Sequence, residues 1–171
     1  MTRHAVIFDV DGTLLQSAAT DDDLYRQSVH EILGPVRFRS SLSDYDFITD
    51  AGILSQIFSD NGIAPSAALV SSIERRFLKA IESHISAHGP FPEVPGARRH
   101  FETLRCSGEY AVGIATGGWR STATVKLESA GFDIRETPLA STNDSPDRVE
   151  IMQIALQRPV SYTHLTLPTK A

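Results

Sequence analysis

The stretch HAVIFDVDGTLLQS, residues 4–17, decides the expected fold. Residues 5–8 form an uninterrupted apolar run, which is typical of a strand buried on both faces of a parallel sheet. We therefore expect a strand over residues 4–10. The run ends in Asp9 and Asp11, and Gly12 follows them with the conformational freedom that a sharp turn needs.

The two aspartates are expected to face one crevice. Ligands of open α/β sheets bind beyond the carboxyl ends of the strands, and side chains two apart on a strand share a face. Two adjacent carboxylates repel each other unless a cation lies between them or one is protonated, and an oxygen-only ligand set suits Mg²⁺. One carboxylate can attack phosphorus while the other moves protons. The alternative is that Asp9 and Asp11 only cap a turn.

Composition excludes several classes of function. The chain has 171 residues, a net charge of −5 and 41% hydrophobic residues, so it is expected to hold one medium domain or a small domain with an insertion. The acidic balance indicates no nucleic-acid or anionic-membrane partner, and no apolar run reaches the roughly 18–20 residues of a membrane span. No signal peptide is recognisable, and Cys106 is the only cysteine. We expect a protein of a reducing, cytoplasmic setting. Its oligomeric state is not indicated.

The remainder of the chain alternates between strand and helix patterns. Residues 16–89, called the helical segment below, show helical periodicity without a convincing strand. A second buried strand is expected over residues 110–116, and a short one lies within residues 137–142. This order predicts an α/β fold with a doubly wound, Rossmann-like parallel sheet. Residues 1–15 and 90–158 would form its core, with the helical segment inserted.

The sequence Thr116-Gly117-Gly118 marks a second potential ligand site. It lies between the expected second strand and a helix, whose first amide groups suit an anion, and glycine lets the backbone approach a ligand closely. An ordinary strand-to-helix turn is the alternative. Trp119 either lines the pocket or packs against the helical segment.

FDVDGTLL (8–15) and AVGIATGGW (111–119) resemble the first two motifs of the haloacid dehalogenase-like (HAD) hydrolases, in particular the phosphoglycolate phosphatase-like branch. The resemblance implies that Asp9 is the nucleophile and Asp11 the general acid/base. It also implies that the Asp9 side chain and the Asp11 carbonyl bind Mg²⁺, and that Thr116 binds the phosphoryl group.

The same resemblance implies roles for the segments around the site. Gly12 and Gly117 would contact the phosphorylated substrate, with residues 12–17 forming a small flap. The helical segment would act as a cap that selects the leaving group, and specificity is expected around residues 21–25 and near Asp50.

The basic residue of the third motif has two candidates. Arg148 begins the last helix pattern, where the family commonly carries it, and is the favoured one. Lys126 is the alternative phosphate-binding residue, although its mid-helix position is typical of a solvent-facing side chain.

The fourth motif of the family, an acidic group that completes the metal ligands, has no match. Asp144 and Asp147 come too early in the chain. Residues 159–171 (PVSYTHLTLPTKA) resemble a translated sequencing adapter, so we expect a non-native tail and a core truncated at its C-terminus. The alternative is a true short tail. Truncation would give weak Mg²⁺ binding and little turnover.

The expected function is Mg²⁺-dependent hydrolysis of a small phosphorylated metabolite through an aspartyl-phosphate intermediate. A phosphomutase would use the same residues, and a non-catalytic fragment or binding module is the alternative from another class. The presence of Asp11 argues against a metal-free dehalogenase.

Overall fold

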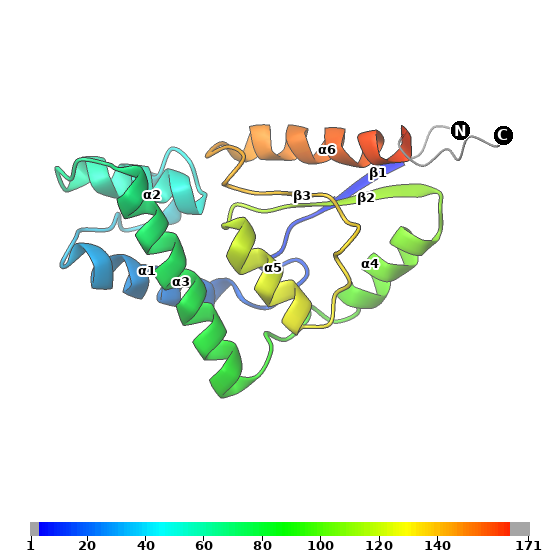
Figure 1. The fold of residues 1–171 in the computed structure, drawn as a ribbon, viewed down its shortest axis with the longest axis horizontal. Helices are drawn as coiled ribbons and strands as arrows, with labels where there is room; N and C mark the ends of the chain where they lie inside the picture. The colour runs from blue at the N-terminus through cyan, green and yellow to red at the C-terminus, as the bar shows by residue number, and fades with distance from the viewer. Residues whose placement is uncertain (1–3, 165–171) are drawn as a thin grey trace.

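The computed structural model describes residues 4–164, with side chains through residue 158, so the predicted non-native tail falls outside the described side chains. Strands β1 (His4–Phe8), β2 (Tyr110–Ala115) and β3 (Leu139–Ala140) form a parallel sheet in the order β1-β2-β3 (Figure 1). This order brings the ends of β1 and β2 side by side, as the site prediction requires.

The first strand ends two residues earlier than predicted, at Phe8. The reason is a tight turn, in which the Val10 carbonyl accepts hydrogen bonds from the N–H groups of Leu14 and Leu15 at 2.9 and 3.0 Å. Asp9 and Asp11 therefore belong to a turn that follows the strand, and their common orientation comes from that turn.

Helices cover both faces of the sheet. Figure 1 shows α6 (Arg148–His164) on one side and α4 (Ala97–Cys106) and α5 (Arg120–Ser129) on the other. The predicted α/β, doubly wound architecture is confirmed. No helix within residues 4–164 is both long and apolar enough to cross a membrane.

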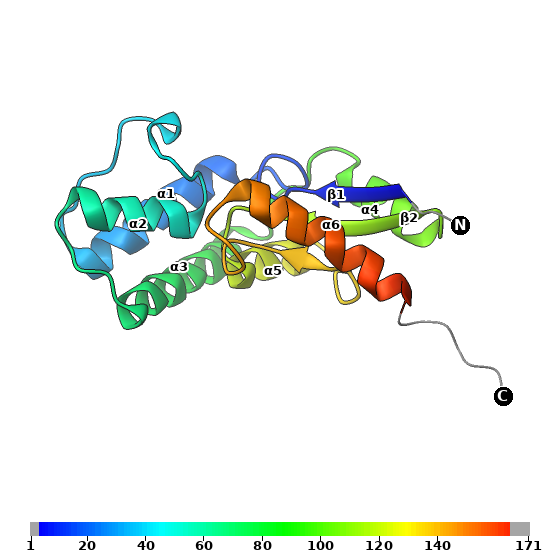
Figure 2. The same cartoon turned by 90° about the horizontal axis from the view of Figure 1, so that it is seen from above.

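The helical segment contains three α-helices and a short 3₁₀ helix, and within it the structure describes no named strand. These are α1 (Ala18–Leu33), η1 (Leu42–Asp44), α2 (Asp50–Asp60) and α3 (Ala67–His88). Figure 2 shows α1, α2 and α3 gathered beyond the end of the sheet toward which β1 points. They therefore stand over the carboxyl edge of the sheet.

The two connections between the helical segment and the sheet run side by side. The Gln16 N–H group donates to the Pro92 carbonyl at 2.8 Å, and the Val94 N–H group donates to the Leu14 carbonyl at 2.9 Å. The stretch of chain that leads into the helical segment is therefore hydrogen-bonded to the stretch that leads out of it. These bonds fix the position of the helical segment relative to the sheet.

An aromatic cluster joins the helical segment to the sheet's helices. The Trp119 ring centroid lies 5.8 Å from that of Tyr25 on α1 and 6.0 Å from that of Phe77 on α3. Trp119 is only 1% exposed. Of the two alternatives for Trp119, the structure thus supports packing against the helical segment.

Candidate active site

A cavity of about 230 Å³ lies between the carboxyl edge of the sheet and the helical segment. On the sheet side its lining includes Asp9, Asp11, Thr116, Gly117 and Arg148. Residues from three separate parts of the chain thus meet at the position where open α/β sheets bind ligands.

The Asp9 carboxylate is held by the turn and by α6. Its Oδ1 atom accepts a hydrogen bond from the Val10 N–H group at 2.8 Å, and its Oδ2 atom accepts one from Arg148 Nη2 at 2.9 Å. Arg148 is at the first position of α6, so the helix start aims its guanidinium at the end of β1. The favoured basic residue therefore reaches the predicted nucleophile.

Gly117 lies where a side chain would not fit. A Cβ atom there would come within 3.0 Å of Arg148 Nη1 and 3.1 Å of the Ile48 carbonyl oxygen. Next to it, Thr116 is buried, and its Oγ1 atom accepts a hydrogen bond from the Gly118 N–H group at 3.1 Å. That bond leaves the hydroxyl hydrogen of Thr116 available to an oxygen in the cavity.

Gly12 does not contribute to the cavity lining among the described residues. It has a φ angle of +83°, and its N–H group donates to the Leu15 carbonyl at 2.7 Å. Gly12 thus has a role in the turn, because only glycine adopts this backbone conformation readily, and its contact with substrate stays a prediction.

The structure corrects the prediction for Lys126. Its side chain is 1% exposed instead of facing solvent, and it does not line the cavity among the described residues. Its Nζ atom donates to Asp11 Oδ1 at 2.6 Å and to Asp21 Oδ1 at 2.5 Å. A buried ammonium requires such partners, and Lys126 finds them in Asp11 and Asp21, while its role in phosphate binding stays a prediction.

The single positive charge of Lys126 is shared between the carboxylates of Asp11 and Asp21. Burial by itself would lower the pKa of Lys126, but Asp21 and Asp11 together raise it above its ordinary value. Burial raises the pKa of Asp21 to about 6, although Lys126 opposes the shift, and Asp11 adds to it. One ammonium therefore leaves this group of three with a net negative charge when both carboxyls are ionised.

The first residue of α2, Asp50, fastens the helical segment to the loop after β2. Its Oδ2 atom accepts a hydrogen bond from the Trp119 N–H group at 2.9 Å, and its own N–H group donates to the Gly117 carbonyl at 2.8 Å. Burial raises the pKa of Asp50 well above its ordinary value, and the charge of Asp21 adds to the shift. The sequence indicated that residues near Asp50 contribute to substrate specificity, but it did not predict the contacts of Asp50 with Gly117 and Trp119.

The predicted metal donors, the Asp9 side chain and the Asp11 backbone carbonyl, belong to residues that line the same cavity. Within the described residues, no group of three or more His, Cys, Asp or Glu side chains is arranged to hold a metal ion. Mg²⁺ is commonly bound by one or two carboxylates together with water and substrate phosphate. The oxygen donors of Asp9 and Asp11 thus fit a Mg²⁺ ion whose other ligands are water and phosphoryl oxygens. They are too few to complete the coordination of Mg²⁺ by themselves.

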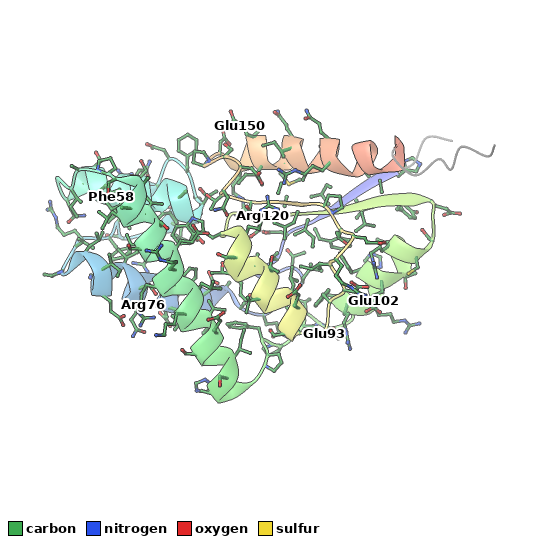
Figure 3. The ribbon with its side chains drawn as sticks, viewed as in Figure 1. Phe58, Arg76, Glu93, Glu102, Arg120 and Glu150 are labelled. Carbon is green, nitrogen blue, oxygen red and sulfur yellow. The ribbon has the colours of Figure 1, made fainter. Side chains whose placement is uncertain are left out.

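Asp144, one of the two acidic residues weighed for the missing fourth motif, is engaged elsewhere. It accepts hydrogen bonds from Arg120 Nη2 at 2.8 Å and Arg158 Nη2 at 2.6 Å. Figure 3 labels Arg120, which begins α5 and also donates to the Leu139 carbonyl at 2.7 Å. Asp144 therefore stabilises the end of β3 and is not part of the cavity lining.

The fold of this chain is similar to the folds of several solved proteins. The sequence matches no protein-family model and no curated protein. Among solved structures, a hydrolase from Pseudomonas syringae is similar with a TM-score of 0.61 and 20% identity, over 84% of this chain and 63% of that chain. CbbY from Rhodobacter sphaeroides, in complex with xylulose-(1,5)bisphosphate, is similar with a TM-score of 0.57 and 17% identity, over 94% of this chain and 73% of that chain.

A third similar structure is a HAD hydrolase of family IA, variant 3, from Entamoeba histolytica. Its TM-score is 0.57 and its identity 15%, over 81% of this chain and 61% of that chain. This chain therefore spans less than two thirds of the Pseudomonas and Entamoeba proteins. At these identities the likeness establishes a shared fold.

Proposed function

We propose that this chain, which has the fold of the HAD hydrolases, is a Mg²⁺-dependent phosphohydrolase that acts on a small phosphorylated metabolite. The fold neighbours support the reaction class, since they include hydrolases and a protein solved with a sugar bisphosphate. The size of the cavity supports a small substrate, because about 230 Å³ is below the roughly 300–1,000 Å³ typical of larger ligands.

The observation that carries the proposal is the meeting of Asp9, Thr116 and Arg148 at one cavity. A carboxylate nucleophile, a hydroxyl donor and a fixed cation are the groups that phosphoryl transfer through a covalent intermediate requires. An ordinary turn would not bring these three residues together, because Asp9 follows β1, Thr116 follows β2 and Arg148 begins α6.

In the first step, an Asp9 oxygen attacks phosphorus and the bond from phosphorus to the leaving oxygen breaks. Asp11 gives its proton to that oxygen, so the alcohol departs neutral. Lys126 and Ser17 both bind Asp11 Oδ1, which leaves Oδ2 to carry the transferred proton. Thr116 and the Gly117 amide group would bind the phosphoryl oxygens.

In the second step, water attacks the phosphorus of the aspartyl-phosphate, and Asp11 accepts the water proton. Phosphate leaves and Asp9 is restored. Arg148 offsets the negative charge of Asp9 and of the phosphoryl oxygens, and a guanidinium keeps its charge at every physiological pH. The helical segment would exclude bulk water during both steps.

Mg²⁺ held by Asp9 and Asp11 would supply further neutralisation of the phosphoryl charge. A similar fold occurs in the HAD hydrolase YfnB from Bacillus subtilis, which was solved bound to magnesium, with a TM-score of 0.50 and 15% identity. This supports the metal dependence, which is part of the proposal.

Hydrolysis of para-nitrophenyl phosphate with Mg²⁺ tests the proposal. Asp9→Asn should lower the rate by at least about 1,000-fold, because the amide is not a nucleophile. The matched control is Asp23→Asn, since Asp23 is exposed on α1 and lies outside the cavity lining. Equal rates for wild type and Asp9→Asn would overturn the proposal, and phosphate transfer to a second hydroxyl would indicate a mutase.

A further inference from the structure

A second cavity, of about 460 Å³, lies at the edge of the sheet that β3 forms. We call it the edge cavity. It is lined by positions 120, 124 and 128 of α5, by residues 134–135 and 137–139, and by Arg158 of α6. Figure 1 shows α5 and α6 on opposite sides of β3. Among the described residues, none lines both the edge cavity and the candidate active site, so a ligand of the edge cavity would bind apart from Asp9.

The edge cavity contains a buried hydroxyl group without a partner. Thr137 lines the cavity and is 8% exposed. Its Oγ1 atom forms no hydrogen bond within the part of the chain that the structure describes. A buried polar group that lacks a partner is unfavourable, and native proteins leave few of them. The hydroxyl of Thr137 therefore points to a ligand atom that accepts its hydrogen bond.

Two arginines from different helices converge at the same cavity. Arg120 Nη1 donates to the Leu139 carbonyl at 2.7 Å, and Arg158 Nη1 donates to the same oxygen. The Nη2 atoms of both arginines donate to Asp144, at 2.8 and 2.6 Å. The two guanidinium groups thus lie close together and share a single carboxylate.

This group of two arginines and one aspartate has one positive charge in excess. Burial alone would raise the pKa of Asp144, but hydrogen bonds from Arg158 and from the Ser141 N–H group hold it below its ordinary value. Asp144 is therefore ionised at neutral pH and balances one of the two cations. A guanidinium carries five N–H groups, so both arginines keep donors for a further acceptor. An oxyanion would accept these hydrogen bonds and balance the remaining charge.

The other two charged residues of the lining are exposed. Glu128 is the one acidic residue among the described residues that line the edge cavity, and its exposure lets salt and water screen its charge. Arg135 is bound to Asp133 through Nε at 2.9 Å and Nη2 at 3.1 Å. The buried hydroxyl and the two converging guanidinium groups therefore define the ligand chemistry of the cavity.

We propose that the edge cavity binds a phosphate-type oxyanion, as the free ion or as the head group of an organic phosphate, with Arg120, Arg158 and Thr137 as its donors. The Thr137 hydroxyl donates to one oxygen, and the guanidinium groups donate to the others. Ile134 and Pro138, which also line the cavity, lie where the carbon atoms of an organic phosphate would make contact. The site is independent of the proposed function, because it uses neither Asp9 nor Mg²⁺.

Isothermal titration calorimetry on the full chain tests the proposal without requiring turnover. The protein carries Arg148→Ala, which removes the cation of the candidate active site, and EDTA removes divalent metal ions. Inorganic phosphate and phenylphosphonate are titrated separately, and at least one should bind with a dissociation constant below about 1 mM. Tighter binding of phenylphosphonate would assign the site to an organic phosphate, and tighter binding of inorganic phosphate would assign it to the free ion.

Thr137→Val shows whether the binding occurs in the edge cavity. Valine keeps the shape of threonine without the hydroxyl, so the affinity should fall at least about tenfold, the usual effect of losing a hydrogen bond to a charged group. The Tm of the ligand-free protein should stay the same or rise, because the hydroxyl has no partner there. A purely structural role of Thr137 predicts the reverse, a lower Tm and unchanged affinity.

Arg158→Gln should likewise weaken binding by about tenfold. Arg75→Gln is the matched control, since Arg75 is exposed on α3 and lines neither cavity. If Arg158→Gln does not fold, Thr137→Val still decides the question. No binding of either probe at concentrations on the order of 10 mM would overturn the proposal. Binding that Thr137→Val leaves unchanged, or that Arg75→Gln weakens equally, would also overturn it.

Discussion

Arg148 Nη2 donates a hydrogen bond to Asp9 Oδ2 at 2.9 Å, although 139 positions separate the two residues. The Arg148 side chain is 48% exposed, and exposed ion pairs contribute little to folding stability. The contact therefore matters for the charge at the predicted nucleophile and hardly at all for the fold.

Replacement of Arg148 separates these two effects. Arg148→Ala should lower kcat/KM for para-nitrophenyl phosphate by about 100-fold or more, because one fixed charge at the phosphoryl group is lost. The free energy of unfolding, measured with urea, should change by less than about 1 kcal/mol. Arg135→Ala is the matched control, since Arg135 is 82% exposed and pairs with Asp133 outside the active-site cavity. An unchanged kcat/KM for Arg148→Ala would contradict the assigned role.

Replacement of Lys126, unlike that of Arg148, should strongly lower the stability of the fold. Lys126→Met keeps the length of the side chain but leaves Asp11 and Asp21 without their shared cation. Removal of one partner from a buried ion pair costs about 3–5 kcal/mol, so the urea midpoint should fall strongly. Adding Asp21→Asn to Lys126→Met should restore part of the loss. A change below about 1 kcal/mol in the single variant would show that the buried group of three charges does not stabilise the fold.

The raised pKa of Asp21 makes stability depend on pH. Its pKa rises from an ordinary value of 3.8 to about 6 in the folded protein. Between these values the folded state holds a proton that the unfolded chain has released, so the free energy of unfolding falls as pH rises. The full contribution is roughly 3 kcal/mol, present below the unfolded pKa and lost above the folded one.

Urea denaturation of wild type and Asp21→Asn at about pH 4 and about pH 7 measures this contribution. Asp21→Asn should lose less stability than wild type between the two pH values. Asp23→Asn, with its exposed carboxyl replaced, should follow wild type. Identical pH dependence in wild type and Asp21→Asn would contradict an elevated pKa at Asp21.

The sequence was sufficient to predict the residues that adjoin the strand ends. Asp9, Asp11 and Thr116 follow two apolar runs, and the parallel arrangement of those runs brings their ends together. The alternation of strands and helices also predicted the layers of the fold. These features depend on local periodicity, which a single sequence displays directly.

The contacts that surround these residues depend on distant pairs and could not be predicted. Lys126 meets Asp11 across 115 positions, and Trp119 meets Asp50 across 69. A lysine in the middle of a helix usually faces solvent, and only the packing of α5 against the helical segment shows that this one is buried. The end of β1 at Phe8 depends likewise on turn hydrogen bonds that periodicity does not reveal.

The most direct test of the central claim is chemical trapping of Asp9 during turnover. Wild-type protein that is hydrolysing para-nitrophenyl phosphate with Mg²⁺ would be quenched in acid, reduced with borohydride and digested for mass spectrometry. An acyl-phosphate on Asp9 predicts that this residue, and not Asp11, is converted to homoserine. Hydrolysis accompanied by an unmodified Asp9 at every quench time, or by homoserine at another aspartate, would contradict the account.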